Sequence, residues 1–438
     1  MKRRSAARNW MPSSARNWGR LVMASEWATA TIGDVAKIKH GFAFKGEFFT
    51  DEVTPNVLVT PGNFAIGGGF QIGKPKYYAG PLPDDYALTE GEVVVTMTDL
   101  SKASDTLGYA AKVPSVPGVT YWHNQRIGLL QVTDKQRACK DWLHYLMRTH
   151  EYRAWVVGSA SGTTVKHTSP SRIESFSFKL PPLEEQRAIA ETLGSLDDRI
   201  DNLRQTNATL EAIAAALFKS WFVDFDGVSA TDMRESELGL IPKGWRIGSF
   251  DEAIEILGGG TPKTSIADYW SGDVPWFSVV DAPGSGQVFV LDTEKKITAL
   301  GLQNCSAKLL PEMTTIISAR GTVGKVAMTG VPMAMNQSCY ALRPRQQSGE
   351  AFVYFSTLRF VEHLQRIAHG AVFDTITRDS FKQVTTCLPP DEVIAGFAEI
   401  ANPLLERIRI NGQQAAILAA LRDALLPRLI SGQLRVAQ

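Results

Sequence analysis

Hydrophobic residues recur with a heptad spacing along one polar-rich segment near the middle of the chain. Steps of four and three residues separate the members of an apolar stripe: Ile189, Leu193, Leu196, Ile200, Leu203, Asn207, Leu210, Ala214 and Leu217. A 3.5-residue period over about four repeats predicts a long helix, at residues 183–222, whose seam packs against another helix. Asn207 occupies this seam, where a polar side chain fixes the register of two helices at a cost in stability.

A second, weaker stripe follows 208 residues later. Its members are Phe397, Ala401, Leu404, Ile408, Asn411, Ala415, Leu418, Arg422 and Leu425. Both stripes begin after Leu-Pro-Pro, at residues 180–182 and 388–390. The residue before a proline disfavours helix whereas proline suits a helix start, so each Leu-Pro-Pro separates a strand from a helix. We predict that the two helices pair with each other; the alternative is that each packs only on its own domain.

Alternating apolar positions outside these helices predict two globular units with the same order of elements. Each unit opens with a tryptophan and an alternating segment that ends in glycine, at residues 27–41 and 245–260. A β-rich run, an Asn-Gln pair, a helix and Leu-Pro-Pro follow in both. The alignment matches Ile38 with Ile256, Gly41 with Gly259, Asn124 with Asn336 and Gln125 with Gln337. Short Val/Ile/Thr-rich strands mixed with a few helices indicate a duplicated chain of the α+β class.

This pattern divides the 438 residues into six segments. They are a disordered basic extension (1–26), a first globular unit (27–182), a central helix (183–226), a linker (227–244), a second globular unit (245–390) and a distal helix with the C-terminal tail (391–438). The extension holds six basic residues and one acidic residue, and the central helix four basic and nine acidic. The net charge is only +1. A chain that bound DNA with so weak a basic face would need help from a basic partner.

Cysteine usage and motif searches exclude several classes of protein. The four cysteines (Cys139, Cys305, Cys339 and Cys387) are scattered, without a C-x-x-C pair or a histidine at zinc-ligand spacing, as in a reduced cytoplasmic protein without a structural metal. No apolar run reaches the roughly 18 residues of a membrane span. Motifs for a dinucleotide, a methyl donor or a target adenine are missing, and "RGTVGKV" (320–326) lacks the spacing of a phosphate-binding loop.

One catalytic pattern survives this search. Asp281 followed by Glu294, Lys295 and Lys296 has the shape of an acidic, metal-binding nuclease core. The corresponding stretch of the first unit, "GKPKYY" (73–78), holds no carboxylate. A solvated strand end is therefore the preferred interpretation. A stand-alone Mg²⁺-dependent DNA nuclease stays open as an alternative function, as does a structural coiled-coil adaptor without a role on DNA.

Loops with polar and basic side chains near glycine are the candidate DNA contacts, because the backbone can approach phosphate there. In the first unit they hold Lys45, Ser101, Lys102, Thr163, Thr164, Lys166 and His167, and in the second Thr261, Lys263, Thr264, Arg320, Thr322 and Lys325. The candidate readers of base edges are Asn124, Gln125, Arg126, Arg320, Asn336 and Gln337. Each of these residues also has a structural interpretation, as a turn or strand-cap residue.

The order of these motifs, which occurs twice, resembles the specificity subunits of type I restriction-modification systems. The resemblance spans about residues 27–438 and depends on "SGTTVKHTS", "LPPLEEQRAIAETLGSLDDRI", "GGGTPKTS" and "RGTVGK". It implies two target recognition domains, each of which reads one half of a bipartite, asymmetric DNA site. Two long antiparallel coiled-coil helices, arranged with pseudo-twofold symmetry, would separate them as a spacer. In the second unit "HGAVFDTI" replaces the Gly-Thr-Thr form, and Arg422 interrupts the seam.

The resemblance also implies chemistry and partners. No catalytic site, metal site or cofactor is expected on this chain. Two copies of an adenine-N6 methyltransferase, which uses S-adenosylmethionine, would dock on the helices. A motor-nuclease that uses ATP and Mg²⁺ would join them for cleavage of double-stranded DNA. We therefore predict a non-catalytic, cytoplasmic specificity subunit that does not associate with membranes.

Overall fold

The computed structural model describes residues 27–99, 101, 105–162, 165–284, 286–367 and 375–436. The chain forms two compact units: unit 1 runs to Ser195 and resumes at Leu421, and unit 2 is Leu196–Ala420. The extension predicted at residues 1–26 lies outside the described residues, as do three candidate contacts, Lys102, Thr163 and Thr164.

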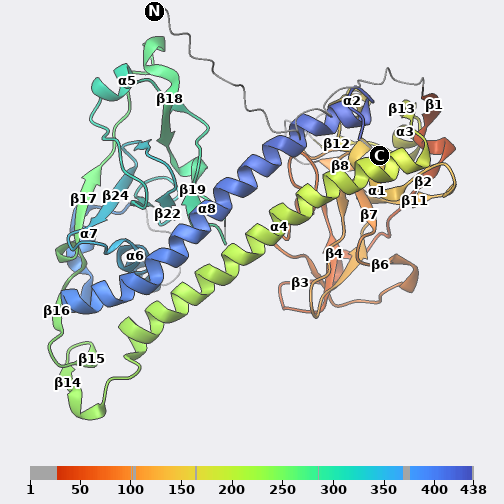
Figure 1. Ribbon diagram of the computed structural model, residues 1–438. Helices are drawn as coiled ribbons and strands as arrows, with labels where there is room; N and C mark the ends of the chain where they lie inside the picture. The colour runs from red at the N-terminus through yellow and green to blue at the C-terminus, as the bar shows by residue number, and fades with distance from the viewer. Residues whose placement is uncertain are drawn as a thin grey trace, which may run out of the picture. The chain divides into compact units, whose positions relative to one another are not determined.

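Unit 1 is built on two small sheets whose strands come from distant parts of the sequence (Figure 1). The four-stranded sheet has the order β2 (Ala36–His40), β11 (Ile127–Val132), β7 (Val93–Thr96) and β9 (Ala110–Lys112). The five-stranded sheet has the order β3 (Phe49–Thr50), β5 (Tyr77–Tyr78), β4 (Asn56–Val59), β10 (Thr120–His123) and β6 (Ala87–Leu88). Two further pairs are β1 (Ala28–Thr31) with β13 (Ser177–Leu180) and β8 (Thr98–Asp99) with β12 (Lys166–His167). The short helices are α1 (Lys140–Leu146), α2 (His150–Gly158) and α3 (Pro170–Glu174).

Unit 2 has the same kind of architecture. Its five-stranded sheet has the order β17 (Ile254–Gly258), β24 (Cys339–Pro344), β21 (Thr315–Ser318), β22 (Val326–Thr329) and β19 (Phe289–Val290). A three-stranded sheet has the order β20 (Lys296–Ile297), β18 (Trp270–Phe277) and β23 (Ala334–Met335), and β16 (Arg246–Ser249) pairs with β25 (Thr385–Leu388). The helices are α5 (Ala299–Gln303), α6 (Glu350–Ile367) and α7 (Arg378–Gln383). Within the segment predicted as a linker, β14 (Met233–Ser236) and β15 (Gly239–Pro242) form a hairpin.

Four strands of the central sheets are equivalent in the two units, and β19 is an additional edge strand in unit 2. Ile38 of β2 lies opposite Leu130 of β11, and Ile256 of β17 lies opposite Leu342 of β24. Each unit also contains a parallel pair, β4 with β10 and β18 with β23, that leads into the central sheet. The predicted duplication of an α+β unit is confirmed by these registers.

The two long helices predicted from the heptads are α4 (Leu183–Lys219) and α8 (Asp391–Ile430), each drawn as one continuous helix in Figure 1. A π-helical turn, Ser220–Asp224, follows α4. In unit 2, Asn207 Nδ2 donates a hydrogen bond to Ile408 O at 3.0 Å. In the π-helical turn after α4, Phe222 packs against Phe397 near the start of α8, with ring centroids 5.0 Å apart. The helices therefore pair in the antiparallel sense.

Half of the predicted seam positions are deeply buried and the others are half-buried, with two departures in α8. The deeply buried members are Ile189, Leu193, Ile200, Leu203, Ala214, Phe397, Ala401, Ile408 and Asn411. Leu196, Asn207, Leu210, Leu217, Leu404, Leu418 and Leu425 are only half-buried. Leu405 and Leu426 are buried more deeply than their predicted neighbours Leu404 and Leu425. The reason is that α8 packs against the hydrophobic core of each unit as well as against α4.

A buried amide ties α4 to the globular part of unit 1. Gln186 has no exposed surface. Its Oε1 accepts a hydrogen bond from Cys139 N at 2.8 Å, at the start of α1, and its Nε2 donates to Arg137 O at 2.7 Å and Pro181 O at 2.8 Å. The conformation of Leu-Pro-Pro and the start of α1 are thus fixed by one side chain of the long helix.

In unit 2 another amide has this role. The position that corresponds to Gln186 is Ile394, which cannot form hydrogen bonds through its side chain. Asn402, two turns further along α8, accepts from Ala351 N at 3.2 Å and donates to Ser348 O at 2.9 Å, again at the start of a domain helix, α6. The tie is kept although the residue and its position have changed.

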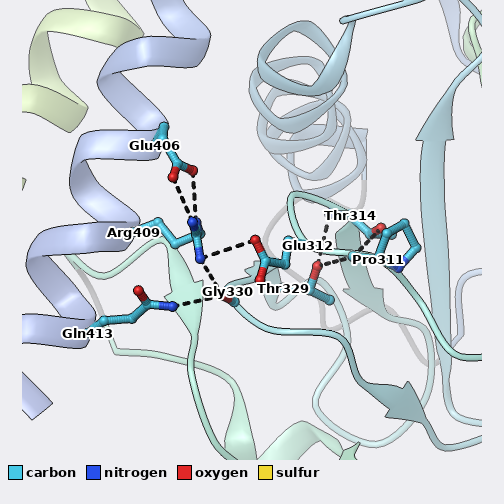
Figure 2. A network of polar contacts seen from close by, with 8 residues as sticks. All are labelled: Pro311, Glu312, Thr314, Thr329, Gly330, Glu406, Arg409 and Gln413. Atoms are coloured by element: carbon cyan, nitrogen blue, oxygen red, sulfur yellow. Dashed lines mark hydrogen bonds and ion pairs between the residues drawn. The ribbon is translucent and has the colours of Figure 1, made fainter. Parts of the chain in front are cut away.

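Arg409 makes a further tie in unit 2, shown in Figure 2. Its guanidinium donates to both carboxylate oxygens of Glu406, at 2.8 and 2.6 Å, and to Gly330 O at 3.1 Å. It also forms an ion pair with Glu312 at 3.1 Å, and Gln413 Nε2 donates to Gly330 O at 3.4 Å. One turn of α8 is therefore held against the segments that enter and leave the β21–β22 hairpin, and the bonds of Arg409 are charge-assisted, which makes them stronger than neutral ones.

Candidate nucleic-acid interface

Most candidate contacts of unit 1 gather at one end of its four-stranded sheet. The segment after β2, the loop between β8 and β9, and the turn of residues 124–126 all leave the sheet at this end. Gln125 N donates to Phe42 O at 2.8 Å, and Met97 N donates to Arg126 O at 2.9 Å. The pairing of β12 with β8 adds Lys166 and His167 to the same end. We call this assembly, within the described residues 41–44, 97–99, 101, 105–109, 124–126, 161–162 and 165–168, loop end 1.

Asp99 organises the loop that carries Ser101. The side chain is buried, and its oxygens accept from Ser101 N and Thr106 N, both at 2.6 Å, and from Thr106 Oγ1 and Leu107 N, both at 2.9 Å. Burial raises the pKa of Asp99, but the hydrogen bonds from Ser101 and Thr106 together outweigh burial, so the pKa lies below its ordinary value. The carboxylate is ionised at neutral pH and shapes the loop from inside.

His123 supports the turn of residues 124–126 from the sheet. Its Nε2 lies 2.8 Å from Ile127 O and donates to that carbonyl, across the turn. Burial lowers the pKa of His123 to about 4, with smaller contributions from other groups. The imidazole is therefore neutral at physiological pH and has a structural role.

Two arginines of unit 1 hold neighbouring loops instead of pointing into solvent. Arg148 is buried, and its Nε donates to Gly67 O at 3.2 Å. Arg153 of α2 donates to Asp105 O at 3.1 Å, and its guanidinium lies 4.2 Å from the centroid of the Tyr109 ring. Both side chains bind the protein's own loops.

Unit 2 repeats the arrangement at the corresponding end of its five-stranded sheet. Ala319 N donates to Ser338 O at 2.8 Å, as Met97 does to Arg126 in unit 1. Ser318 Oγ donates to Thr322 O at 2.6 Å and accepts from Lys325 N at 2.8 Å, which closes the loop between β21 and β22. We call residues 259–261, 319–325, 336–338 and 375 loop end 2. It brings together the candidates Thr261, Arg320, Thr322, Lys325, Asn336 and Gln337.

A glycine makes room for the Asn-Gln turn in both units. A Cβ atom at Gly41 would overlap the carbonyl oxygen of Asn124, and one at Gly259 would overlap the carbonyl oxygen of Asn336. The next residue donates its N–H to the strand before the turn in each case, at 2.9 Å from Phe42 to His123 and 3.0 Å from Gly260 to Met335. The predicted match of these glycines and asparagines is confirmed by this shared contact.

Three candidates lie outside these assemblies. Lys45 precedes the short helical turn Gly46–Phe48, and its ammonium is 3.9 Å from Glu47. Lys263 and Thr264 are exposed in a turn whose main chain is held by Trp270 Nε1, which donates to Lys263 O at 3.3 Å. These contacts tie the three residues to local turns and not to either loop end.

The sequence did not predict the residues whose side chains hold the main chain of the loops in place. These are Asp99, His123, Arg148, Arg153 and Ser318. Asp99 alone carried a local signal, because an aspartate followed by Ser and Thr after a strand is typical of a side chain that bonds the nearby backbone. The other four bind main-chain atoms that no sequence motif marks.

Asp281, the central residue of the nuclease alternative, has a structural role. Its Oδ2 accepts from Ser278 N at 2.8 Å and Ser278 Oγ at 2.9 Å, and its Oδ1 accepts from Glu294 N at 2.7 Å. Asn63 forms the same cap on Thr60 in unit 1. No group of three His, Cys, Asp or Glu side chains that could hold a metal ion occurs in the described part of the chain. Across the same residues, no helix has the length and apolarity to cross a membrane.

Comparisons with known proteins agree with this duplicated arrangement. A family model described as a type I restriction modification DNA specificity domain matches residues 24–212 and again residues 242–419. The chain is 27% identical over 346 residues to the specificity subunit of the type I restriction enzyme HindI from Haemophilus influenzae, a match that covers 65% of this chain and 75% of that one. It is 25% identical over 317 residues to the MjaIX specificity subunit from Methanocaldococcus jannaschii, with 71% and 73% covered.

A solved structure supports the fold. The S subunit of a type I restriction-modification system from M. genitalium superimposes with a TM-score of 0.57 at 15% identity, over 94% of this chain and 98% of that chain. At this identity the likeness concerns the fold alone. It agrees with a duplicated fold of small mixed sheets and helices that includes two long helices.

Proposed function

The chain belongs to the type I restriction modification DNA specificity family, and from this premise we propose that it selects the DNA sequence for its complex, each unit reading one half of a bipartite, asymmetric site. The observation that carries the proposal is the repetition of one loop assembly, loop end 1 in unit 1 and loop end 2 in unit 2. Loops on a rigid sheet are typical positions for binding residues. The chain acts in recognition and not in catalysis, as a specificity subunit.

We assign the DNA contacts to the candidates that the loop ends bring together. In loop end 1 these are Ser101, Asn124, Gln125, Arg126, Lys166 and His167, and in loop end 2 Thr261, Arg320, Thr322, Lys325, Asn336 and Gln337. Lys45, Lys102, Thr163, Thr164, Lys263 and Thr264 remain proposed contacts from the sequence pattern. The proposed recognition domains are residues 27–182 and 245–390, and the spacer helices fall within 183–226 and 391–438.

The long helices are the proposed spacer and docking surface. Four of their aliphatic side chains, Ile213, Ile400, Ile417 and Leu421, are 45–68% exposed. Ile213 lies in an acidic segment, since residues 183–226 carry nine acidic and four basic residues, whereas the other three lie on α8, where the charges are nearly balanced. Partner helices with apolar positions would fit these side chains, and basic residues beside those positions would suit α4. We propose that two adenine-N6 methyltransferase subunits dock there with S-adenosylmethionine, and that an ATP- and Mg²⁺-dependent motor-nuclease joins them in the cytoplasm.

The low net charge of the chain suggests that its partner subunits also bind the DNA. A net charge of +1 provides little of the phosphate attraction that usually dominates affinity. The methyltransferase subunits would therefore supply much of the affinity, while this chain supplies sequence selection.

The test is reconstitution with the methyltransferase subunit of the same system. The two proteins should co-purify, and adenine methylation of genomic DNA should map to one bipartite sequence. Exchange of residues 27–180 for those of another family member should change one half of that sequence only. Failure to co-purify, or methylation without sequence preference, would count against the proposal.

A further inference from the structure

Loop ends 1 and 2 present the same amide side chain from the same turn. Ile127 N donates to Asn124 O at 2.9 Å in unit 1, and Cys339 N approaches Asn336 O at 3.4 Å in unit 2. Both are four-residue turns that begin with asparagine, and glutamine is the second residue of each. Gln125 and Gln337 are both exposed, whereas the asparagines before them are half-buried.

The main chain of each turn is held from two sides, which fixes the point from which each glutamine side chain extends. The strand after the turn is in the central sheet, and the strand before it belongs to the parallel pair. The close approach of the glycine to the asparagine carbonyl further restricts the main chain of the turn. Because the main chain is already fixed, binding costs little backbone conformational entropy at these positions.

A glutamine amide has a preferred partner among the base edges of the major groove. It pairs in bidentate fashion with adenine: the side-chain oxygen accepts from N6, and the side-chain nitrogen donates to N7. In unit 2, Thr261 Oγ1 donates to Gln337 Oε1, which orients the amide so that its nitrogen faces away from Thr261. The corresponding residue of unit 1 is Ala43, which has no hydroxyl, so the Gln125 amide lacks this orienting bond.

We propose that Gln125 and Gln337 each read one adenine in the major groove, one in each half of the recognised site. The inference rests on the proposed function and adds to it a named base and a named atom pair. Each adenine read in this way stays stacked in the duplex. It is therefore distinct from the adenine that is methylated, since methyltransferases extrude their target base.

The experiment uses the complex of the full chain with the methyltransferase subunit and duplexes that carry the mapped bipartite site. Each adenine other than the methylation target is replaced in turn by 7-deazaadenine, which lacks the N7 acceptor. For the wild-type complex, one replacement in each half-site should weaken binding about tenfold or more. The Gln125→Ala variant should bind natural DNA about as weakly and should no longer respond to the replacement in one half. Gln337→Ala should do the same for the other half.

Matched controls are Gln136→Ala and Gln347→Ala, which remove exposed glutamines outside the loop ends. Both should keep wild-type binding and the full response to 7-deazaadenine. Thr261→Val should weaken the response in the second half-site only. The inference is overturned if Gln125→Ala weakens all sequences equally, if its effect multiplies with that of 7-deazaadenine, or if it has no effect. A wild-type complex that recognises no bipartite site would instead overturn the proposed function.

Discussion

Gly259 illustrates how tightly a single residue can constrain the conformation of a loop. Substitution by alanine would place a Cβ atom on the carbonyl oxygen of Asn336, so the turn or β17 has to move. Overpacking of this kind typically costs about 1–3 kcal/mol. We expect Gly259→Ala to lower the stability of unit 2 by that amount and to weaken recognition of one half-site about tenfold. Differential scanning calorimetry and binding titrations measure the two effects.

The control for this prediction is the neighbouring residue. A Cβ atom at Gly258 meets no atom within 4 Å, so Gly258→Ala should preserve both stability and binding. In unit 1, Gly41→Ala and Gly46→Ala form the same contrast, because Gly46 also has open space around its Cα. Equal behaviour of the two members of a pair would contradict the role assigned to the close approach.

Asp99 makes the stability of unit 1 dependent on acid. Because its pKa is lower in the folded protein than the ordinary value of 3.8, its contribution is fully present above about pH 4 and is lost as the pH falls through the lower, folded pKa. Asp99→Asn leaves buried N–H donors without an acceptor and should destabilise unit 1 by about 1–3 kcal/mol at pH 7. The difference in the free energy of unfolding between wild type and variant should narrow as the pH falls below about 4.

Thermal unfolding at a series of pH values measures this difference. Asp273→Asn, which changes an exposed carboxylate of unit 2, is the control and should have a small effect at every pH. A constant gap between wild type and Asp99→Asn across the whole range would show that ionisation of Asp99 is irrelevant.

At the scale of single residues, the sequence predicted positions that the two units share. It did not predict contacts that a side chain makes with a distant main-chain atom. Gly41 with Gly259 and Asn124 with Asn336 could be paired because both units have the same order of strands, and the registers confirm the pairing. Arg153 was not predicted, because it binds the carbonyl of Asp105, 48 residues away, and a contact with a main-chain atom leaves no trace in residue type.

At the scale of elements, the contact between Asn207 and Asn411 governs the pairing of α4 with α8. Asn411 Nδ2 donates to Asn207 Oδ1 at 2.9 Å, and Asn411 is only 1% exposed. Asn207→Leu removes the acceptor and leaves the buried Asn411 amide without its bond, which should cost about 1–3 kcal/mol. The double variant Asn207→Leu/Asn411→Leu replaces both polar groups and should be more stable than Asn207→Leu alone.

Chemical denaturation of the wild type, Asn207→Leu, Asn411→Leu and the double variant gives the coupling energy between the two sites. Asn202→Leu changes an exposed asparagine of the same helix and serves as the control. Effects that simply add would mean that the two asparagines do not act as a pair. The double variant should pair its helices with a less specific register, because an apolar seam lets one helix slide along the other and a polar contact opposes this.

The existence and length of the long helices were predictable, but their exact buried face was not. A heptad stripe predicts the residues that face one partner helix. Helix α8 packs against α4 and also against the globular core. Leu405 and Leu426 are buried by the second partner, which the stripe ignores. The hairpin of β14 and β15 was overlooked for a related reason, because polar composition and turn residues describe a linker and a small hairpin equally well.

At the scale of the whole molecule, the spacer proposal predicts a change in the recognised site. Removal of residues 196–202 from α4 and 414–420 from α8 deletes one heptad from each helix and spares Asn207, Asn411 and Gln413. The helices should shorten by about 10 Å, which corresponds to about three base pairs. The preferred gap between the half-sites should shrink accordingly when measured by methylation of duplexes with a range of gap lengths. An unchanged gap would reject the role of the helices as a spacer.

The tie made by Gln186 has an implication for how such chains diversify. Its three partners are Cys139 N, Arg137 O and Pro181 O, all of them main-chain atoms. These hydrogen bonds therefore do not depend on the side chains of the partner residues. Any sequence that places the same main-chain groups at the start of α1 can form them. A recognition domain can drift in sequence, or be exchanged for a foreign one, without losing its attachment, so new specificities can arise while the helical frame stays as it is.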